Sequence, residues 1–317
     1  MPAVASIGAL HGGEFLPPLL GTVLYIVLYR RRTGTLAREH RPVAVWRRIA
    51  FYTGVATVAV VQVPPFDGLA DSLLVAHMVQ HIVLGDLASL AIILGVTGPV
   101  LAPLLRTRAS NATRKLSHPL VAVVLWAVDL YAWHLPFFYQ LAIQHDLVHA
   151  LEHACMLWFG ALLWLALIGP LPKPRWFAGG WELGYVMLVR FLGSVLANVL
   201  IWGQTVFYPI YRVTDQGRGL SPLSDQSLAG GIMMLEQVIL TTLLLAWLFR
   251  RVSRRDEERQ SLLDWAARNG LPLDPERAAR AAAAGSTARL RERMLEQSQP
   301  SERGGEGLRP SRHRPGP

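Results

Sequence analysis

Two stretches of the sequence place histidines four residues apart inside otherwise apolar segments. The first is HMVQH, which carries His77 and His81, and the second is HALEH, which carries His149 and His153. Residues four apart in a helix lie on the same face, so each stretch presents two imidazoles together. Neutral imidazole is a ligand for copper, zinc, nickel and iron. Two such pairs, each at the head of an apolar run, predict a metal site.

Neighbouring residues extend this candidate site. Met156 lies three residues after His153 on the same helical face, and its thioether favours Cu(I). Glu152 lies three residues after His149, where it can accept a hydrogen bond from a ligating imidazole as a supporting residue. His134 ends another apolar run and can approach the same cluster. We therefore expect the metal ligands to come from His77, His81, His149, His153, His134 and Met156.

The composition indicates a membrane protein. Of the 317 residues, 52% are hydrophobic, and several apolar runs are long enough to cross a hydrocarbon core about 30 Å thick. The single cysteine, Cys155, excludes an internal disulfide framework and a metal site built from cysteines. The formal net charge is +9, but the arginines crowd the ends of the apolar runs. The expected partner of these cations is the lipid bilayer and not a nucleic acid.

We predict an all-α fold, a polytopic transmembrane helical bundle with seven spans. The spans are expected near residues 14–30, 47–64, 72–99, 119–136, 147–169, 182–208 and 229–249. Arginines fill the connection after the first span, whereas the connection after the second holds Asp67 and Asp71 and no cation. This alternation continues along most of the chain. By the positive-inside rule, the N-terminus is outside and the C-terminus cytoplasmic.

The domain organisation follows the same change in composition. Residues 1–249 are expected to form the seven-helix transmembrane domain, and residues 250–297 a cytoplasmic, Arg-rich helical tail. Residues 298–317 are rich in Pro, Gly, Ser and Arg and are expected to be disordered. The arginines of the tail are expected to lie against the anionic inner leaflet.

The predicted topology places both histidine pairs at the outer side of the membrane. Spans three and five run in the same direction, so each pair lies about 5 to 15 Å below the outer surface. If these spans are neighbours, four imidazoles converge at one depth. A single histidine near a membrane boundary is more often a hydrogen-bonded structural residue than a ligand. Two pairs at matching depth favour the metal site over that alternative.

Ionisable residues within the predicted spans form a second group of interest. Asp86, Asp129, Arg190 and Glu236 are costly in hydrocarbon and require partners within the bundle, or water. Met233 and Met234 open the seventh span and, on their own, are more often packing residues than ligands.

Four ordered blocks of the sequence resemble the CtaG family of caa-type cytochrome c oxidase assembly factors. The blocks are HMVQH, WHLPFFY at residues 133–139, HALEH, and SPLSDQSLAGGIMM at residues 221–234. The resemblance covers about residues 15–250. The matching positions are His77, Gln80, His81, Trp133, His134, Pro136, Tyr139, His149, Glu152, His153, Asp225 and Gln226. Asp86 and Glu236 depart from the family pattern, which has apolar or neutral residues there, and indicate an additional proton-binding or metal-binding group.

The resemblance implies a seven-helix protein of the bacterial plasma membrane that assembles haem–copper cytochrome c oxidase for the respiratory chain. It implies a non-enzymatic role in which copper is bound at the histidines and passed to the oxidase catalytic subunit. Asp225 and Glu236, with Glu152, are expected to support the ligands. A copper transporter and a haem-binding redox protein remain as alternatives, because two helices with histidines at equal depth can also hold a bis-imidazole haem.

Overall fold

The computed structural model describes residues 16–107, 115–116, 118–171, 173–174, 176–177 and 179–298. Every regular element within these ranges is a helix, which confirms the all-α prediction. The chain divides into two compact units, residues 1–243 and residues 244–317. The first unit contains the candidate site, and each unit is described by itself.

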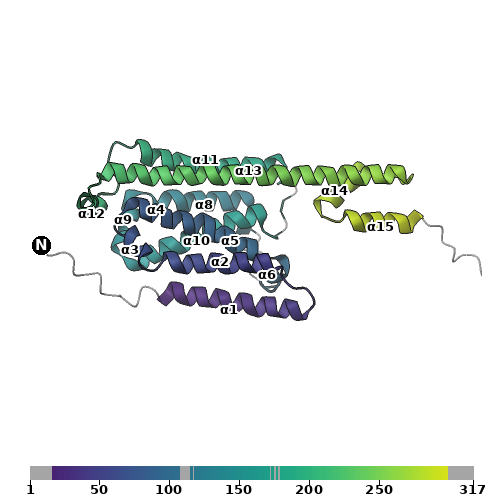
Figure 1. Cartoon of the computed structure of the whole chain (residues 1–317), viewed down its shortest axis with the longest axis horizontal. Helices are drawn as coiled ribbons and strands as arrows, with labels where there is room; N and C mark the ends of the chain where they lie inside the picture. The colour runs from purple at the N-terminus through teal and green to yellow at the C-terminus, as the bar shows by residue number, and fades with distance from the viewer. Residues whose placement is uncertain are drawn as a thin grey trace, which may run out of the picture. The chain divides into compact units, whose positions relative to one another are not determined.

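The first unit consists of long helices joined by short helical segments (Figure 1). In chain order they are α1 (Leu16–Arg38), α2 (Val45–Val61), α3 (Phe66–Ala70), α4 (Leu74–Ile82), the π-helical turn η1 (Val83–Ala88), α5 (Ser89–Gly95), α6 (Gly98–Leu105), α8 (Pro119–Trp133), α9 (Pro136–Gln144), α10 (Asp146–Ile168), α11 (Gly180–Trp202), the 3₁₀ turn η2 (Pro209–Tyr211), α12 (Arg212–Gly217) and α13 (Pro222–Arg268). Helix α13 contributes its residues up to Leu243 to this unit.

Helix α10 has a central place in the packing of the first unit (Figure 1). It contacts α5 and η1 on one side and α8 and α9 on the other, while α2 packs against α5 and η1. Helix α11 packs against α8, and its backbone also comes close to α13 at Gly230. The segment α4–η1–α5 and α10 correspond to the third and fifth predicted spans. They are neighbours, as the convergence of the histidine pairs requires.

A glycine allows α10 to approach η1 very closely. A Cβ atom built on Gly160 would lie 2.0 Å from the carbonyl oxygen of Gly85, so no larger residue fits without moving one of the helices. In the π-helical turn the backbone hydrogen bonds depart from the α-helical pattern, so its carbonyl groups can accept from side chains. The indole N–H of Trp164 donates to the carbonyl of Asp86 at 3.0 Å, and the hydroxyl of Ser89 donates to the carbonyl of Gly85. The Trp164 contact ties α10 to the segment that carries HMVQH, and the Ser89 contact lies within that segment.

Four helical segments are long and apolar enough to cross a membrane: Leu74–Gly95, Asp146–Ile168, Gly180–Trp202 and Pro222–Arg268. The pair α8 and α9 makes a fifth candidate if it is counted as one span bent by 72°. The bend follows from Pro136, which favours extended backbone at Leu135. Helix α9 was not predicted from the sequence. The described helices thus include four or five candidate spans, and the full number of seven stays a prediction.

The second unit contains the rest of α13, with α14 (Pro275–Ala283) and α15 (Thr287–Ser298). Its small core consists of Leu262, Ala266, Ala278, Ala281, Leu290 and Met294. The predicted boundary after residue 249 falls within α13, which continues because no glycine or proline occurs between Gly231 and Gly270. Gly270, with a φ of 65°, follows the end of this helix. Residues 299–317, where disorder is expected, lie outside the described residues.

Candidate metal centre

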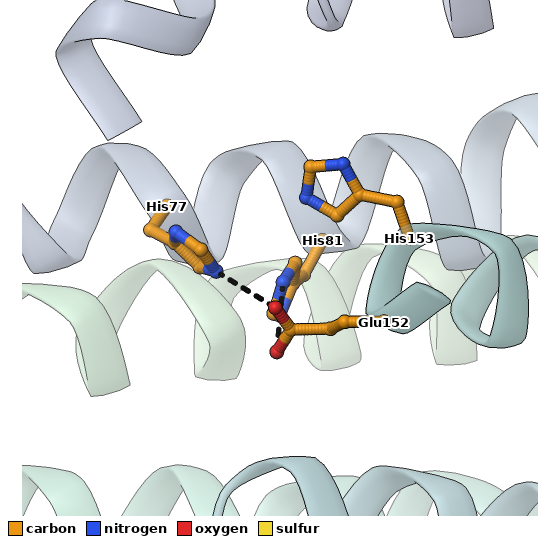
Figure 2. Close-up of side chains that lie close together, drawn as sticks. All are labelled: His77, His81, Glu152 and His153. Carbon is orange, nitrogen blue, oxygen red and sulfur yellow. Dashed lines mark ion pairs between the residues drawn. The ribbon is translucent and has the colours of Figure 1, made fainter. Parts of the chain in front are cut away.

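Four side chains from two helices converge within the first unit (Figure 2). Helix α4 provides His77 and His81, and α10 provides Glu152 and His153. One ligand atom from each residue can be chosen so that all four atoms lie within 4.8 Å of one another. None of the four residues is more than 6% exposed. Three imidazoles and a carboxylate therefore share one water-excluded space.

The distances within this cluster suit a bound cation better than direct hydrogen bonds. Nε2 of His77 lies 3.8 Å from Oε2 of Glu152, and Nε2 of His81 lies 3.5 Å from Oε1 of the same carboxylate. A hydrogen bond between these atoms would be nearer 3 Å. Ligand atoms about 2.1 Å from a metal in tetrahedral geometry lie about 3.4 Å apart. The spacing of the carboxylate and the two imidazoles is close to that value.

The polar atoms of the cluster also lack other partners among the described residues. Both ring nitrogens of His77 and of His81 are buried without a hydrogen bond, as are both carboxylate oxygens of Glu152 and Nε2 of His153. Buried polar groups without partners are rare in native proteins and usually indicate a water or an ion. The donor set, three imidazoles and one carboxylate, is one that copper and zinc accept.

The remaining predicted ligands, His149, His134 and Met156, lie around these four residues and are not part of the group of four. The His149 ring is stacked 5.2 Å from that of His77 and lies 4.2 Å from that of His153, and its Nε2 also has no partner. The His134 ring lies 5.9 Å from that of His81. Met156 lines a small cavity that His81 also lines. Glu152 was expected only to support the ligands, but its carboxylate lies as close to the imidazoles of His77 and His81 as two ligands of one metal would lie.

Asp225 holds the helix that carries His77 and His81. Its carboxylate accepts the backbone N–H of Leu74 at 2.6 Å and that of Val75 at 3.1 Å. These are N–H groups of the first turn of α4, which no side chain of α4 itself caps. The next residue, Gln226, accepts the N–H of Phe207 at 2.9 Å and donates to the carbonyl of Thr205 at 3.1 Å. The Asp-Gln pair thus fixes α4 and the 203–208 loop to the start of α13.

Tyrosines enclose the cluster on the side of α9 and η2. The ring of Tyr139 lies 5.0 Å from that of His77, and its hydroxyl is 2.9 Å from the hydroxyl of Tyr211. The Tyr211 hydroxyl donates to the carbonyl of Ala70 at 3.2 Å, and that of Tyr208 donates to the carbonyl of His134 at 2.7 Å. Tyr208 and Tyr211 were not singled out from the sequence. The sequence feature that could have pointed to them is the tyrosine at each end of YPIY, residues 208–211.

A comparison with protein families identifies the family of this chain. The model of a family described as "Cytochrome c oxidase caa3 assembly factor (Caa3_CtaG)" matches residues 23–255. The chain belongs to this family. The match confirms the resemblance seen in the sequence, and the matched range includes every residue of the four-residue cluster and of the contacts that position it.

Two mycobacterial proteins are similar to this chain. They are "Uncharacterized protein Mb0105" of Mycobacterium bovis and "Uncharacterized protein MT0111" of Mycobacterium tuberculosis. Each is 27% identical over 251 residues, a match that covers 73% of this chain and 37% of the relative. The chain therefore spans less than half the length of these relatives. No solved structure matches it.

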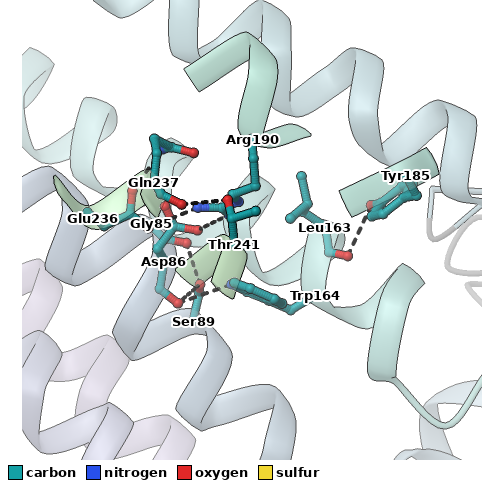
Figure 3. A network of polar contacts seen from close by, with 10 residues as sticks. All are labelled: Gly85, Asp86, Ser89, Leu163, Trp164, Tyr185, Arg190, Glu236, Gln237 and Thr241. Carbon is teal, nitrogen blue, oxygen red and sulfur yellow. Dashed lines mark hydrogen bonds and ion pairs between the residues drawn. The ribbon is translucent and has the colours of Figure 1, made fainter. Parts of the chain in front are cut away.

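The two acidic residues that depart from the family pattern share one partner (Figure 3). Arg190 of α11 donates to Asp86 of η1 at 3.0 Å and to Glu236 of α13 at 2.9 Å. The amide of Gln237 donates to the other oxygen of Glu236 at 2.8 Å. For Asp86, Arg190 and Glu236, the expectation of partners within the bundle is met by a buried ion triad, whereas Oδ2 of the buried Asp129 has no hydrogen-bond partner among the described residues. Glu236 supports this triad and does not contact the imidazoles through any described hydrogen bond.

Another acidic residue lies close to the Asp225 cap. Asp215 of α12 is 1% exposed, and its carboxylate oxygens have no hydrogen-bond partner among the described residues. Burial and the neighbouring Asp225 raise the pKa of the Asp215 carboxyl from 3.8 to about 6. The ionisation of Asp215 is therefore coupled to the residue that holds the N-terminus of α4.

Proposed function

We propose that this protein is a multi-pass assembly factor of the bacterial plasma membrane that supplies copper to cytochrome c oxidase. The observation that carries the proposal is the buried cluster of His77, His81, Glu152 and His153 in a member of the caa3 assembly factor family. Cytochrome c oxidase subunits would be its partners, and copper would be its cargo and not a catalytic cofactor.

The chemistry of the cluster supports copper as the cargo. Imidazole and carboxylate ligands bind copper more tightly than the other divalent metals of the first transition row, and imidazole also accepts Cu(I). His149 supports a role in transfer. Its unpartnered Nε2 lies beside the cluster, where it offers an additional ligand during exchange. A carrier with such an alternative ligand can release its ion without leaving the ion uncoordinated.

The predicted topology supports delivery at the outer face. Both histidine pairs lie near the N-terminal ends of α4 and α10, and both helices would begin at the outer side under the positive-inside rule. We include in the proposal the seven spans, the outer N-terminus and the cytoplasmic C-terminus. Helix α2, with 17 residues, is at the lower limit of length for a span, and α1 carries its arginines at the predicted inner end.

Transport of copper across the membrane is the second candidate function. The observation that favours it is the cavity that extends from His81 to Asp86 and Glu236, because ionisable groups deeper in the bundle are typical of ion pathways. Both carboxylates are, however, paired with Arg190. Uptake of copper into proteoliposomes would favour transport, and its absence together with copper binding would favour the assembly role.

Metal analysis of the purified protein tests the proposed function. The native protein, loaded with Cu(I) under reducing conditions and freed of excess metal, is expected to retain copper. A variant with His77→Ala, His81→Ala and His153→Ala is expected to lose it. The matched control is His145→Ala, which changes an exposed histidine immediately before α10. Equal copper in the triple variant and the native protein would contradict the proposed site.

The role in assembly requires a second measurement in cells. In a strain without the native gene, the triple variant is expected to insert in the membrane and leave cytochrome c oxidase activity low. The His145→Ala control is expected to restore that activity. Normal oxidase activity with the inserted triple variant would contradict copper delivery through this cluster.

A further inference from the structure

A small cavity beside the candidate metal centre contains the side chains of a second, softer ligand set. The cavity has a volume of about 50 Å³ and is lined by Met78, Met156, Met233 and His134, among others. These residues come from α4, α10, α13 and the end of α8. Each is at most 6% exposed. Three thioethers and an imidazole from four separate segments thus border one small cavity.

The tautomer of His134 determines which of its ring nitrogens presents a lone pair for a cation. Nδ1 lies 2.7 Å from the carbonyl oxygen of Leu130, which can only accept a hydrogen bond, so Nδ1 carries the proton. Nε2 of the neutral ring therefore presents a lone pair. This atom lies 3.3 Å from the sulfur of Met78, which has no hydrogen to donate. Two electron-pair donors face each other with no proton between them, an arrangement that a soft cation would stabilise.

The charges around the cavity favour the same occupant. Asp86 and Glu236 also line it, and Arg190 is their shared partner. When both carboxylates are ionised, the formal charge of this triad is −1. An uncompensated negative charge in a buried, low-dielectric region attracts a cation. The described cavity therefore combines soft neutral ligands with two carboxylates that share one guanidinium.

We propose that Met78, Met156, Met233 and His134 form a second metal site, selective for a soft monovalent cation such as Cu(I). Thioethers select Cu(I) over Zn(II), whereas the imidazole and carboxylate cluster accepts both. His81 belongs to the cluster and also lines the cavity, and its ring lies 5.9 Å from that of His134. The two sites are adjacent, and His81 connects them. This inference deepens the proposed function and rests on it, because the proposed function supplies copper as the cargo of both sites.

Binding of two probe metals to the purified full chain in detergent tests the second site. Ag(I) is a redox-inert soft monovalent cation, and Zn(II) reports on the imidazole and carboxylate cluster. The native protein is expected to bind one more equivalent of Ag(I) than the variant Met78→Leu, Met156→Leu, Met233→Leu. Leucine is close to methionine in volume, so this variant is expected to fold and to keep its Zn(II). The matched control is Met187→Leu, at a position 48% exposed on α11.

The variants separate this inference from the proposed function. If the triple Met→Leu variant binds as much Ag(I) as the native protein, the second site is wrong, whatever the cluster binds. If the His77→Ala, His81→Ala, His153→Ala variant loses Zn(II) and keeps an equivalent of Ag(I) that the Met→Leu changes remove, the second site stands. If the native protein binds no Zn(II) but its Ag(I) depends on the methionines, the proposed cluster fails and the second site stands.

X-ray absorption of the Cu(I)-loaded protein supplies a direct readout of the ligands. Sulfur neighbours are expected around copper in the native protein and in Met187→Leu, and are expected to disappear in the triple Met→Leu variant. A copper environment of nitrogen and oxygen alone in the native protein would contradict the second site.

Discussion

The carboxylate of Asp225 accepts the backbone N–H of Leu74 at 2.6 Å, across 151 residues of sequence. Three residues after Leu74, the same helix presents His77 to the cluster. Asp225 is only 1% exposed, so its hydrogen bonds to α4 do not compete with bulk water. The first turn of the helix that carries His77 and His81 is therefore positioned by a residue at the start of α13.

Replacement of Asp225 by alanine is expected to loosen this attachment. Loss of a side-chain cap on a helix N-terminus costs about 0.5 to 2 kcal/mol of stability. We expect a lower thermal midpoint in detergent and weaker Zn(II) binding, because the register of His77 and His81 depends on the first turn of α4. The control is Ser224→Ala, at an exposed neighbouring position. Unchanged stability in Asp225→Ala would contradict the capping role.

Glu152 tests whether the carboxylate is a ligand or a supporting residue. Glutamine at this position keeps an oxygen that accepts a hydrogen bond, but it removes the charge that binds a metal. If Glu152 is a ligand, Glu152→Gln is expected to weaken Zn(II) binding beyond the roughly 10- to 100-fold typical of outer-shell changes. Competitive titration with a chelator measures the affinity. A loss of about 100-fold or less would return Glu152 to the supporting role predicted from the sequence.

The sequence was sufficient for the positions of several long helices and for the grouping of histidines on one helical face. The predicted span 147–169 corresponds to α10, Asp146–Ile168, because a long apolar run bounded by polar residues specifies a membrane helix. Four-residue spacing was sufficient to place His77 with His81 on one face. These are local properties of the chain, which periodicity and hydropathy report directly.

The details of the site depend on contacts between distant segments, which one sequence does not reveal. Glu152 faces the histidines because of the rotation of α10 relative to α4, which the close approach of Gly160 to Gly85 helps to set. Arg190 pairs with Asp86 across 104 residues, and no local pattern relates these two residues. The bend before α9 was missed because Leu135 and Pro136 were placed at the end of the predicted span 119–136, and the residues after them were taken as a connection.

Gly160 is expected to be required for this rotation and approach. In Gly160→Ala the added methyl would meet the Gly85 carbonyl at 2.0 Å, so α10 must move away from η1. Overpacking of this kind typically costs about 1 to 3 kcal/mol. The control is Gly184→Ala in α11, where nothing lies within 4 Å of the new Cβ and the higher helix propensity of alanine is the main effect. Thermal unfolding in detergent is expected to show a loss for Gly160→Ala and no loss for Gly184→Ala.

The buried carboxyl of Asp215 is expected to make the stability of the protein depend on pH. Its folded-state pKa, about 6, is above the ordinary value of 3.8, so folding favours the protonated form. The stability that this group contributes is fully present below about pH 4 and is lost as the pH rises through 6. Asp215→Asn cannot ionise, and at pH 8 we expect it to be more stable than the native protein by about 2 to 3 kcal/mol.

The advantage of Asp215→Asn is expected to shrink as the pH falls from 8 to 4. Thermal unfolding of both proteins across this range measures it, with Asp256→Asn at an exposed position as the control. An advantage that does not change with pH would show that the amide acts through packing, and not through the removal of a buried charge.

The ion triad predicts that Arg190 matters chiefly because it neutralises buried carboxylates. Arg190→Leu leaves Asp86 and Glu236 facing each other without their cation, which typically costs about 3 to 5 kcal/mol. The variant Arg190→Leu, Asp86→Leu, Glu236→Leu removes all three charges and is expected to recover most of that loss, because apolar replacements of buried ion groups are often neutral or stabilising. Thermal unfolding in detergent compares the two variants. If the fully apolar variant were no more stable than Arg190→Leu alone, the loss would come from packing of the arginine side chain against Trp164 and its neighbours, and not from unpaired charge.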